Sequence, residues 1–233
     1  MRLTPDELTF FLAILPLIIL SLTIHEYAHA RTAQAFGDDT ARLMGRCSFN
    51  PLRHLDPVGT LVLLFTQGFG WAKPVPVNKA NLHPPRLGDI AVSLAGPASN
   101  LMLAVIAAFL VRFMLLHGLD GHTHAQQVAY HLLLILIQMN IGLAVFNLLP
   151  LFPLDGHHIA REMLPGEKQA SFMIWQMRHG WVVLMVVMMG PRLVSTLLHR
   201  PIFDPVGYCI GELLDLFGRL FGIDPLVQVF AFQ

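Results

Sequence analysis

The chain has 233 residues, of which 55% are hydrophobic and 13% are charged, and its formal net charge is zero. Soluble domains carry about 25% charged residues, so this composition indicates a membrane protein. The sequence contains no run of basic residues, which argues against a nucleic-acid-binding surface. Its two cysteines, Cys47 and Cys209, form no CxxC pair, so neither a disulfide framework nor a thiolate zinc site is indicated.

Residues 8–30 form the first long apolar run, and Glu26 is its single charged side chain. The run exceeds the ~20 residues that a helix needs to cross ~30 Å of hydrocarbon. Near its end, residues 25–29 read HEYAH, which is the HExxH pattern of zinc hydrolases. We therefore expect a zinc site within a membrane-spanning helix.

The HExxH spacing carries specific chemistry. On a helix, His25 and His29 lie about 40° apart around the axis and ~6 Å apart along it, so both imidazoles can bind one metal ion. Glu26 is rotated by about 100° from His25, where it can act as general base on a zinc-bound water whose pKa falls towards ~7. The alternative is a chance pattern, or a buried polar pair that packs helices together. Burying these groups in lipid without a function costs several kcal/mol, which favours one Zn²⁺ per chain.

The distribution of Lys and Arg predicts the topology. Residues 31–89 contain seven of these side chains and residues 156–178 contain three, whereas residues 113–124 contain none. By the positive-inside rule, the first two regions face the cytoplasm. The apolar run 58–69 spans only ~18 Å as a helix and begins and ends on the cytoplasmic side. We expect it to enter the membrane and return as a re-entrant segment.

Further apolar runs follow. Residues 90–111 and 125–154 carry no charge and are long enough to span. Residues 172–198 are interrupted by two arginines and a proline, and we expect a fourth span there. Residues 205–221 mix charged and apolar side chains, which predicts an interfacial amphipathic helix or a weak last span.

These runs predict an all-α polytopic membrane protein. We expect about four to six transmembrane helices, a re-entrant segment, and a short β or loop element on the cytoplasmic side. No gap between the runs accommodates an added soluble domain. The expected organisation is one domain over residues 1–233, with a catalytic core at about 8–165 and C-terminal helices at about 170–222.

A catalytic zinc needs a third protein ligand, and Asp155 is the candidate. It follows the uncharged run 125–154 at the predicted cytoplasmic end of that run. His25 and His29 also lie near the cytoplasmic end of their helix, because Arg31 follows at once. The topology therefore predicts that all three side chains lie at the same depth.

Pro150 and Pro153 should break the helix before Asp155 and turn its carboxylate inward. The alternative for Asp155 is a turn in which Asp-Gly merely ends a helix. Glu162 and Glu167 are weaker candidates for the third ligand, because solvated acids are usual in a charged loop.

Residues 73–77 read KPVPV. In a strand, Pro74 and Pro76 would put their missing N–H groups on one edge, while Val75 and Val77 keep theirs on the other. This predicts an edge that pairs with an extended substrate. A simple proline-rich cytoplasmic loop is the equally open alternative.

Three motifs accompany HExxH, in the order GWAKPVPVN at 70–78, AGPASN at 95–100, and NLLP followed by LDG at 147–156. Together they make the chain resemble the site-2 protease family of intramembrane zinc metalloproteases over residues 10–165. The resemblance is to the short form, because the chain has no room for a PDZ or CBS domain.

The resemblance implies a set of roles. His25, His29 and Asp155 would bind Zn²⁺, and Glu26 would be the general base. Asn147 would contact the substrate or stabilise the oxyanion. Members of this family cleave transmembrane segments of other proteins, so the expected partners are a transmembrane protein substrate and the lipid bilayer, without nucleic acid.

For several residues in these motifs we expect a role in packing or at the surface, and not in catalysis. Gly96 and Ser99 predict a small-residue face for close helix packing, with Asn100 as a further polar contact. His157 and His158 are either hydrogen-bond donors near the site or surface side chains.

The expected location is a multi-pass protein of the cell (inner) membrane, with its active site towards the cytoplasm; the sequence leaves the oligomeric state open. A single HxxxH pair argues against a di-iron desaturase. The remaining alternative is a membrane metal-binding protein or transporter without protease activity, although internal repeats typical of transporters are absent.

Overall fold

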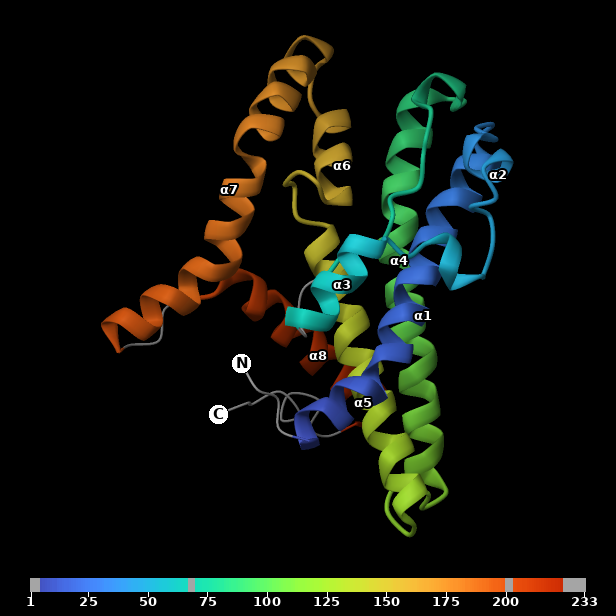
Figure 1. Cartoon of the computed structure of the whole chain (residues 1–233), viewed down its shortest axis with the longest axis vertical. Helices are drawn as coiled ribbons and strands as arrows, with labels where there is room; N and C mark the ends of the chain where they lie inside the picture. Colours follow the sequence, from blue (N-terminus) through green and yellow to red (C-terminus); the bar gives the residue numbers. More distant parts are fainter. Residues whose placement is uncertain (1–4, 67–69, 200–202, 224–233) are drawn as a thin grey trace. The chain divides into compact units, whose positions relative to one another are not determined.

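The computed structural model describes residues 5–66, 70–199 and 203–223. Within these ranges the chain forms helices and connecting loops and contains no strand (Figure 1). In chain order the elements are α1 (Pro5–Ala35), α2 (Thr40–Leu43), the 3₁₀ turn η1 (Pro51–Arg53), α3 (Pro57–Thr66), the 3₁₀ turn η2 (Lys79–Asn81), α4 (Pro85–Leu116), α5 (His124–Asn147), α6 (Asp155–Met163), α7 (Gly166–Leu198) and α8 (Pro205–Phe221).

Among the described helices, four are long and apolar enough to cross a membrane: Thr9–Ala35, Pro85–Leu116, His124–Asn147 and Gly166–Leu198. The predicted all-α polytopic architecture is confirmed, and the protein is an integral multi-pass membrane protein. The helix α8 has 17 residues and is not among the four.

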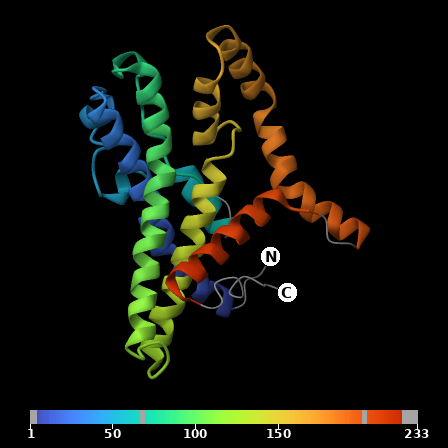
Figure 2. The same ribbon diagram turned by 180° about the vertical axis from the view of Figure 1, so that it is seen from behind.

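The chain divides into two compact units, Met1–Leu103 and Ala104–Gln233, each described by itself. In the first unit, α1 and the first part of α4 lie side by side (Figures 1 and 2). Buried Ala33, Leu82 and Val92 pack together, with Phe36 and Val77 against them. This small core joins the end of α1, the loop before α4, and α4 itself.

Asp38 fastens the loop that follows α1. Its fully buried carboxylate accepts hydrogen bonds from the backbone N–H groups of Thr40 (3.1 Å) and Asn78 (2.7 Å) and from the Asn81 amide (3.0 Å). Desolvation raises the pKa of Asp38, but these hydrogen bonds outweigh it, and the pKa lies below its usual value. The carboxylate therefore joins chain segments about forty residues apart.

The two ends of the segment that contains α3 lie next to each other. Leu55 and Ala72 form an antiparallel bridge across its base. A Cβ on Gly59 would lie 2.2 Å from the Trp71 carbonyl oxygen, so the returning chain packs directly against α3. The predicted return of the 58–69 run is thereby confirmed at its base, whereas residues 67–69 lie outside the described residues. Its depth in the membrane stays a prediction.

The expected β element is reduced to this single bridge. Lys73–Val77 does not form a strand. The physical reason is that a strand needs a neighbouring strand to satisfy its backbone N–H and C=O groups. Arg46, not a strand, takes two of the carbonyls of this segment.

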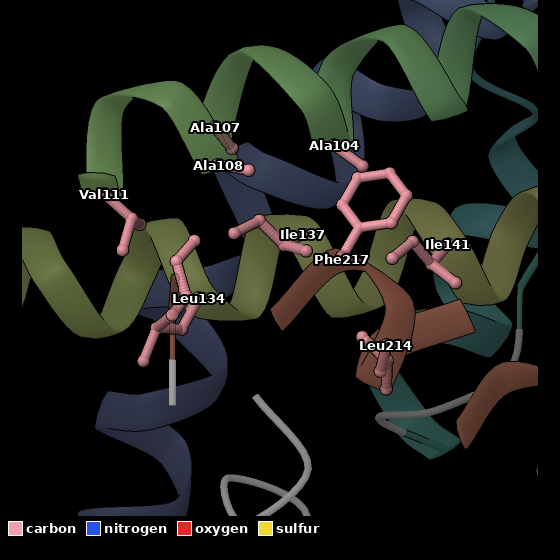
Figure 3. Packing of buried hydrophobic residues seen from close by; sticks show 10 residues of the cluster. Ala104, Ala107, Ala108, Val111, Leu134, Ile137, Ile141, Leu214 and Phe217 are labelled. Carbon is pink, nitrogen blue, oxygen red and sulfur yellow. The ribbon is translucent and has the colours of Figure 1, made fainter. Parts of the chain in front are cut away.

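In the second unit, the last part of α4 runs beside α5, and α8 packs on this pair (Figures 1 and 2). Figure 3 shows the buried residues that join them. Alanines at 104, 107 and 108 let the α4 and α5 backbones approach closely. The core consists of Ala104, Ala107, Ala108, Val111, Leu134, Ile137, Ile141, Leu214, Phe217 and Ile223.

The helix α5 ends at Asn147, so the span expected to continue to residue 154 is shorter than predicted. The chain beyond it is held by Gln176 of α7, which is 1% exposed. Its Oε1 accepts from the Phe152 N–H at 2.9 Å, and its Nε2 donates to the Pro150 carbonyl at 2.7 Å. A side chain from α7 thus replaces the intrahelical partners that this apolar segment lacks.

Candidate metal centre

The HExxH residues lie on α1 and are almost fully buried, with 6% of His25, 9% of Glu26 and 7% of His29 exposed. The four-residue spacing brings the two imidazoles together on one face of the helix. Their ring centroids are 4.6 Å apart and their Nε2 atoms 3.0 Å apart.

The other ring nitrogens are held by α4. The His29 Nδ1 lies 2.7 Å from the Val92 carbonyl oxygen, and the His25 Nδ1 lies 2.6 Å from the Asn100 Oδ1. A carbonyl oxygen only accepts, so the hydrogen sits on Nδ1 of His29. The same assignment follows for His25, with the Asn100 amide oriented so that its oxygen faces the ring. Both Nε2 atoms therefore present lone pairs to each other.

Two facing lone pairs repel unless a cation lies between them. Tetrahedral zinc with Zn–N bonds of ~2.0–2.1 Å places its nitrogen ligands about 3.3–3.4 Å apart, close to the observed 3.0 Å. Zinc-bound histidines usually donate their second N–H to a carbonyl or carboxylate, which fixes the tautomer and the ring. The His25–His29 pair fits a zinc ion on these grounds.

Gly96 makes this approach of α4 to α1 possible. A Cβ at this position would lie 2.4 Å from the His29 Nε2 and 2.6 Å from the His25 Nε2. The predicted small-residue packing face is therefore present, and the element packed against Gly96 is the histidine pair itself. Val92, Gly96 and Asn100 recur every four residues, which places them on one stripe of α4.

Arg46 is a charged neighbour of Glu26 that the sequence indicates only as one of the basic residues on the cytoplasmic side. Its Nη2 atom lies 4.0 Å from the Glu26 Oε2, and the side chain is 5% exposed. Burial lowers the pKa of Arg46, and the Glu26 carboxylate partly restores it. Arg46 lies seventeen residues beyond the end of the HExxH motif. At that separation, no pattern in the sequence indicates that its side chain will contact the motif.

Asn147 and Asp155 belong to the second unit. Asn147 is the last residue of α5, and its Nδ2 donates to the Leu143 carbonyl at 2.9 Å. Asp155 is the first residue of α6, so the interpretation in which it merely ends a helix is wrong. An acidic side chain in the first turn is favoured by the helix dipole. A Cβ on Gly156 would lie 2.2 Å from the Leu148 carbonyl oxygen, which explains the glycine of LDG.

The remaining candidates have other partners or positions. Glu162 is 8% exposed and pairs with Arg161 at 2.5 Å, whereas Glu167 is exposed in the first turn of α7. His157 is 2% exposed and its Nδ1 lies 2.5 Å from the Leu154 carbonyl oxygen. The surface interpretation is therefore wrong for His157, which steadies the residue before Asp155.

We expect Asn100→Leu to lower zinc affinity about 10–100-fold, because the His25 Nδ1–H loses its acceptor and the ring its orientation. Asn100→Asp keeps an acceptor oxygen and should bind zinc within a few-fold of wild type. The measurement is a chelator competition titration on the purified protein, with Ser99→Ala as the neighbouring control. Equal zinc affinity in Asn100→Leu and wild type would remove Asn100 from the site.

We expect Gly96→Ala to lose most of its zinc, because the added methyl would overlap the Nε2 atoms of both histidines. Gly142→Ala in α5 is the matched control, since its nearest neighbour would be 4.0 Å away. Alanine there should leave zinc content unchanged and slightly stabilise the helix. Metal content and thermal unfolding measured on both variants check this, and a fully zinc-loaded Gly96→Ala protein contradicts it.

The sequence matches known proteins of one family. A model of peptidase family M50 matches residues 113–189. The chain is 44% identical over 174 residues to "Putative zinc metalloprotease YwhC" of Bacillus subtilis, covering 75% of this chain and 78% of that protein. Two proteins of the same description, named Rip2, are 30% identical in Mycolicibacterium smegmatis and 31% identical in Mycobacterium tuberculosis strain H37Rv, each over 75% of this chain and 66% of the relative. No solved structure matches.

The identity to YwhC extends over most of both chains, and the family's metal is the one that the histidine pair fits, Zn²⁺. The chain therefore belongs to peptidase family M50, the site-2 protease family of membrane zinc metalloproteases.

Proposed function

We propose that the protein is an intramembrane endopeptidase that hydrolyses peptide bonds in or near the transmembrane segments of other membrane proteins. The observation that carries this proposal is the burial of His25, Glu26 and His29 on α1, a helix long and apolar enough to cross a membrane. A peptide bond must come to these side chains, so its chain must be at membrane depth. The relatives named as zinc metalloproteases support the hydrolytic chemistry.

His25, His29 and Asp155 are the proposed zinc ligands. The geometry of the histidine pair supports the first two, and the position of Asp155 at the start of α6 supports the third. Bound zinc supplies Lewis acidity, which activates water and polarises a carbonyl. The two Nδ1–H groups keep their hydrogens throughout, held by Val92 and Asn100.

Glu26 is the proposed general base. It takes the proton of the attacking water and returns it to the leaving amine. Asn147 has a second N–H beyond the one that its Nδ2 donates to Leu143. That N–H is the proposed donor to the substrate carbonyl or to the oxyanion that forms from it.

The proposed location is the cell membrane, with the active site towards the cytoplasm. The seven Lys and Arg side chains of residues 31–89 support this orientation. Water would reach Glu26 from the same side. An extended substrate would run along Lys73–Val77, with the N–H groups of Val75 and Val77 as its pairing edge.

We expect Glu26→Gln to lower cleavage by about 10²–10⁴-fold while zinc content stays at the wild-type level, because Glu26 moves a proton and does not hold the metal. The assay reconstitutes the purified protein in lipid vesicles with a panel of single-span reporter proteins and follows their cleavage. Glu167→Gln, an exposed acid on α7, is the matched control and should cleave normally.

Two outcomes would contradict the proposal. One is equal cleavage by wild type and Glu26→Gln, and the other is cleavage that persists after a chelator has removed zinc. A wild-type protein that binds zinc and cleaves none of the reporters favours a metal-binding protein or transporter.

A further inference from the structure

Arg46 lies in the loop after α2, carries a permanent charge, and is only 4% exposed. A buried charge is tolerated where other groups pair with it and accept its hydrogens. The two Nη atoms of Arg46 have such partners, and these partners connect parts of the first unit that are distant in sequence.

The guanidinium is held by the backbone of the Lys73–Val77 segment. Its Nη1 donates to the Pro74 carbonyl at 3.1 Å, and its Nη2 donates to the Lys73 carbonyl. Two consecutive carbonyls are thus bound by one planar fork, a geometry that lysine cannot reproduce.

The charge of Arg46 is opposed by Glu26. The Nη2 atom lies 4.0 Å from the Glu26 Oε2, at the outer limit of an ion pair. The Pro74 and Lys73 carbonyls each accept one hydrogen bond from the guanidinium, and at 4.0 Å the Glu26 carboxylate faces the positive charge without a short hydrogen bond to it.

The Lys73–Val77 segment is anchored at both ends. The Lys73 N–H donates to the His54 carbonyl at 2.7 Å, and the Asn78 N–H donates to Asp38 at 2.7 Å. Pro74 and Pro76 fix their own φ angles between these anchors. If the Pro74 carbonyl moves, the Arg46 guanidinium bound to it must move as well. That movement would shift the positive charge that faces the Glu26 carboxylate.

We propose that Arg46 is a positioning residue that couples the Lys73–Val77 segment to Glu26, so that an extended substrate bound along the segment fixes the carboxylate for proton transfer. This inference rests on the proposed endopeptidase function. It assigns to Arg46 no contact with the zinc ligands and no proton of its own.

The test compares Arg46→Lys and Arg46→Gln with Arg53→Lys and Arg53→Gln, which change an exposed arginine of the nearby turn η1. The readouts are zinc content, kcat and KM on the single-span reporter that wild type cleaves fastest. We expect both Arg46 variants to retain zinc and to lose at least about tenfold in kcat with a smaller change in KM, because Arg46→Lys keeps the charge but loses the fork. The Arg53 variants should behave as wild type.

A second measurement does not need activity. Glu26→Gln leaves the Arg46 charge unopposed, so its thermal unfolding midpoint should fall, and adding Arg46→Gln should recover part of that loss. Purely additive shifts, or a kcat in Arg46→Lys and Arg46→Gln equal to that of wild type, would overturn the coupling. If wild type cleaves no reporter, the endopeptidase proposal fails, whereas the unfolding midpoints still decide whether Arg46 and Glu26 are coupled.

Discussion

Polar groups within a membrane must find their hydrogen-bond partners in the protein, because the hydrocarbon offers none. The two imidazoles meet this constraint through α4. The Val92 carbonyl and the Asn100 amide take one ring nitrogen each, and Gly96 removes the side chain that would keep the helices apart. As a result, the lone pairs of the two Nε2 atoms point toward each other. A metal cation between them stabilises this arrangement. The proposed zinc site therefore depends on the same hydrogen bonds that satisfy the buried histidines within a membrane.

The same constraint organises the irregular part of the first unit. Between α1 and α4 the chain has no sheet in its described residues, and individual buried polar side chains replace one. Asp38 binds the backbone of Asn78, and Arg46 binds the Lys73 and Pro74 carbonyls. His54 is fully buried, with its Nε2 2.7 Å from the Ser48 carbonyl oxygen. These residues hold a loop next to the proposed general base, which accounts for charged and polar side chains that are buried outside the helices.

The features that the sequence predicts are those that depend on residues close together in the chain. Helical periodicity alone predicts that His25 and His29 share a face, and hydropathy predicts the long spans, because both depend on near neighbours. The end of α5 at Asn147 was missed because hydropathy does not register the hydrogen bonds that Gln176 makes to Pro150 and Phe152. Arg46 was missed for the same reason, since its contacts join distant segments. The stripe of Val92, Gly96 and Asn100 did carry a signal, a four-residue spacing that matches the two histidines.

We propose that two histidines of α1 and the aspartate that begins α6 hold one catalytic zinc ion. The most direct measurement is a chelator competition titration that compares wild type, Asp155→Ala and the exposed-acid control Asp120→Ala. We expect Asp155→Ala to lose at least about tenfold in zinc affinity, because the proposed three-ligand site would be reduced to two ligands, while Asp120→Ala should bind as wild type. Unchanged zinc affinity in Asp155→Ala, in a protein whose His25→Ala variant no longer binds zinc, would contradict it.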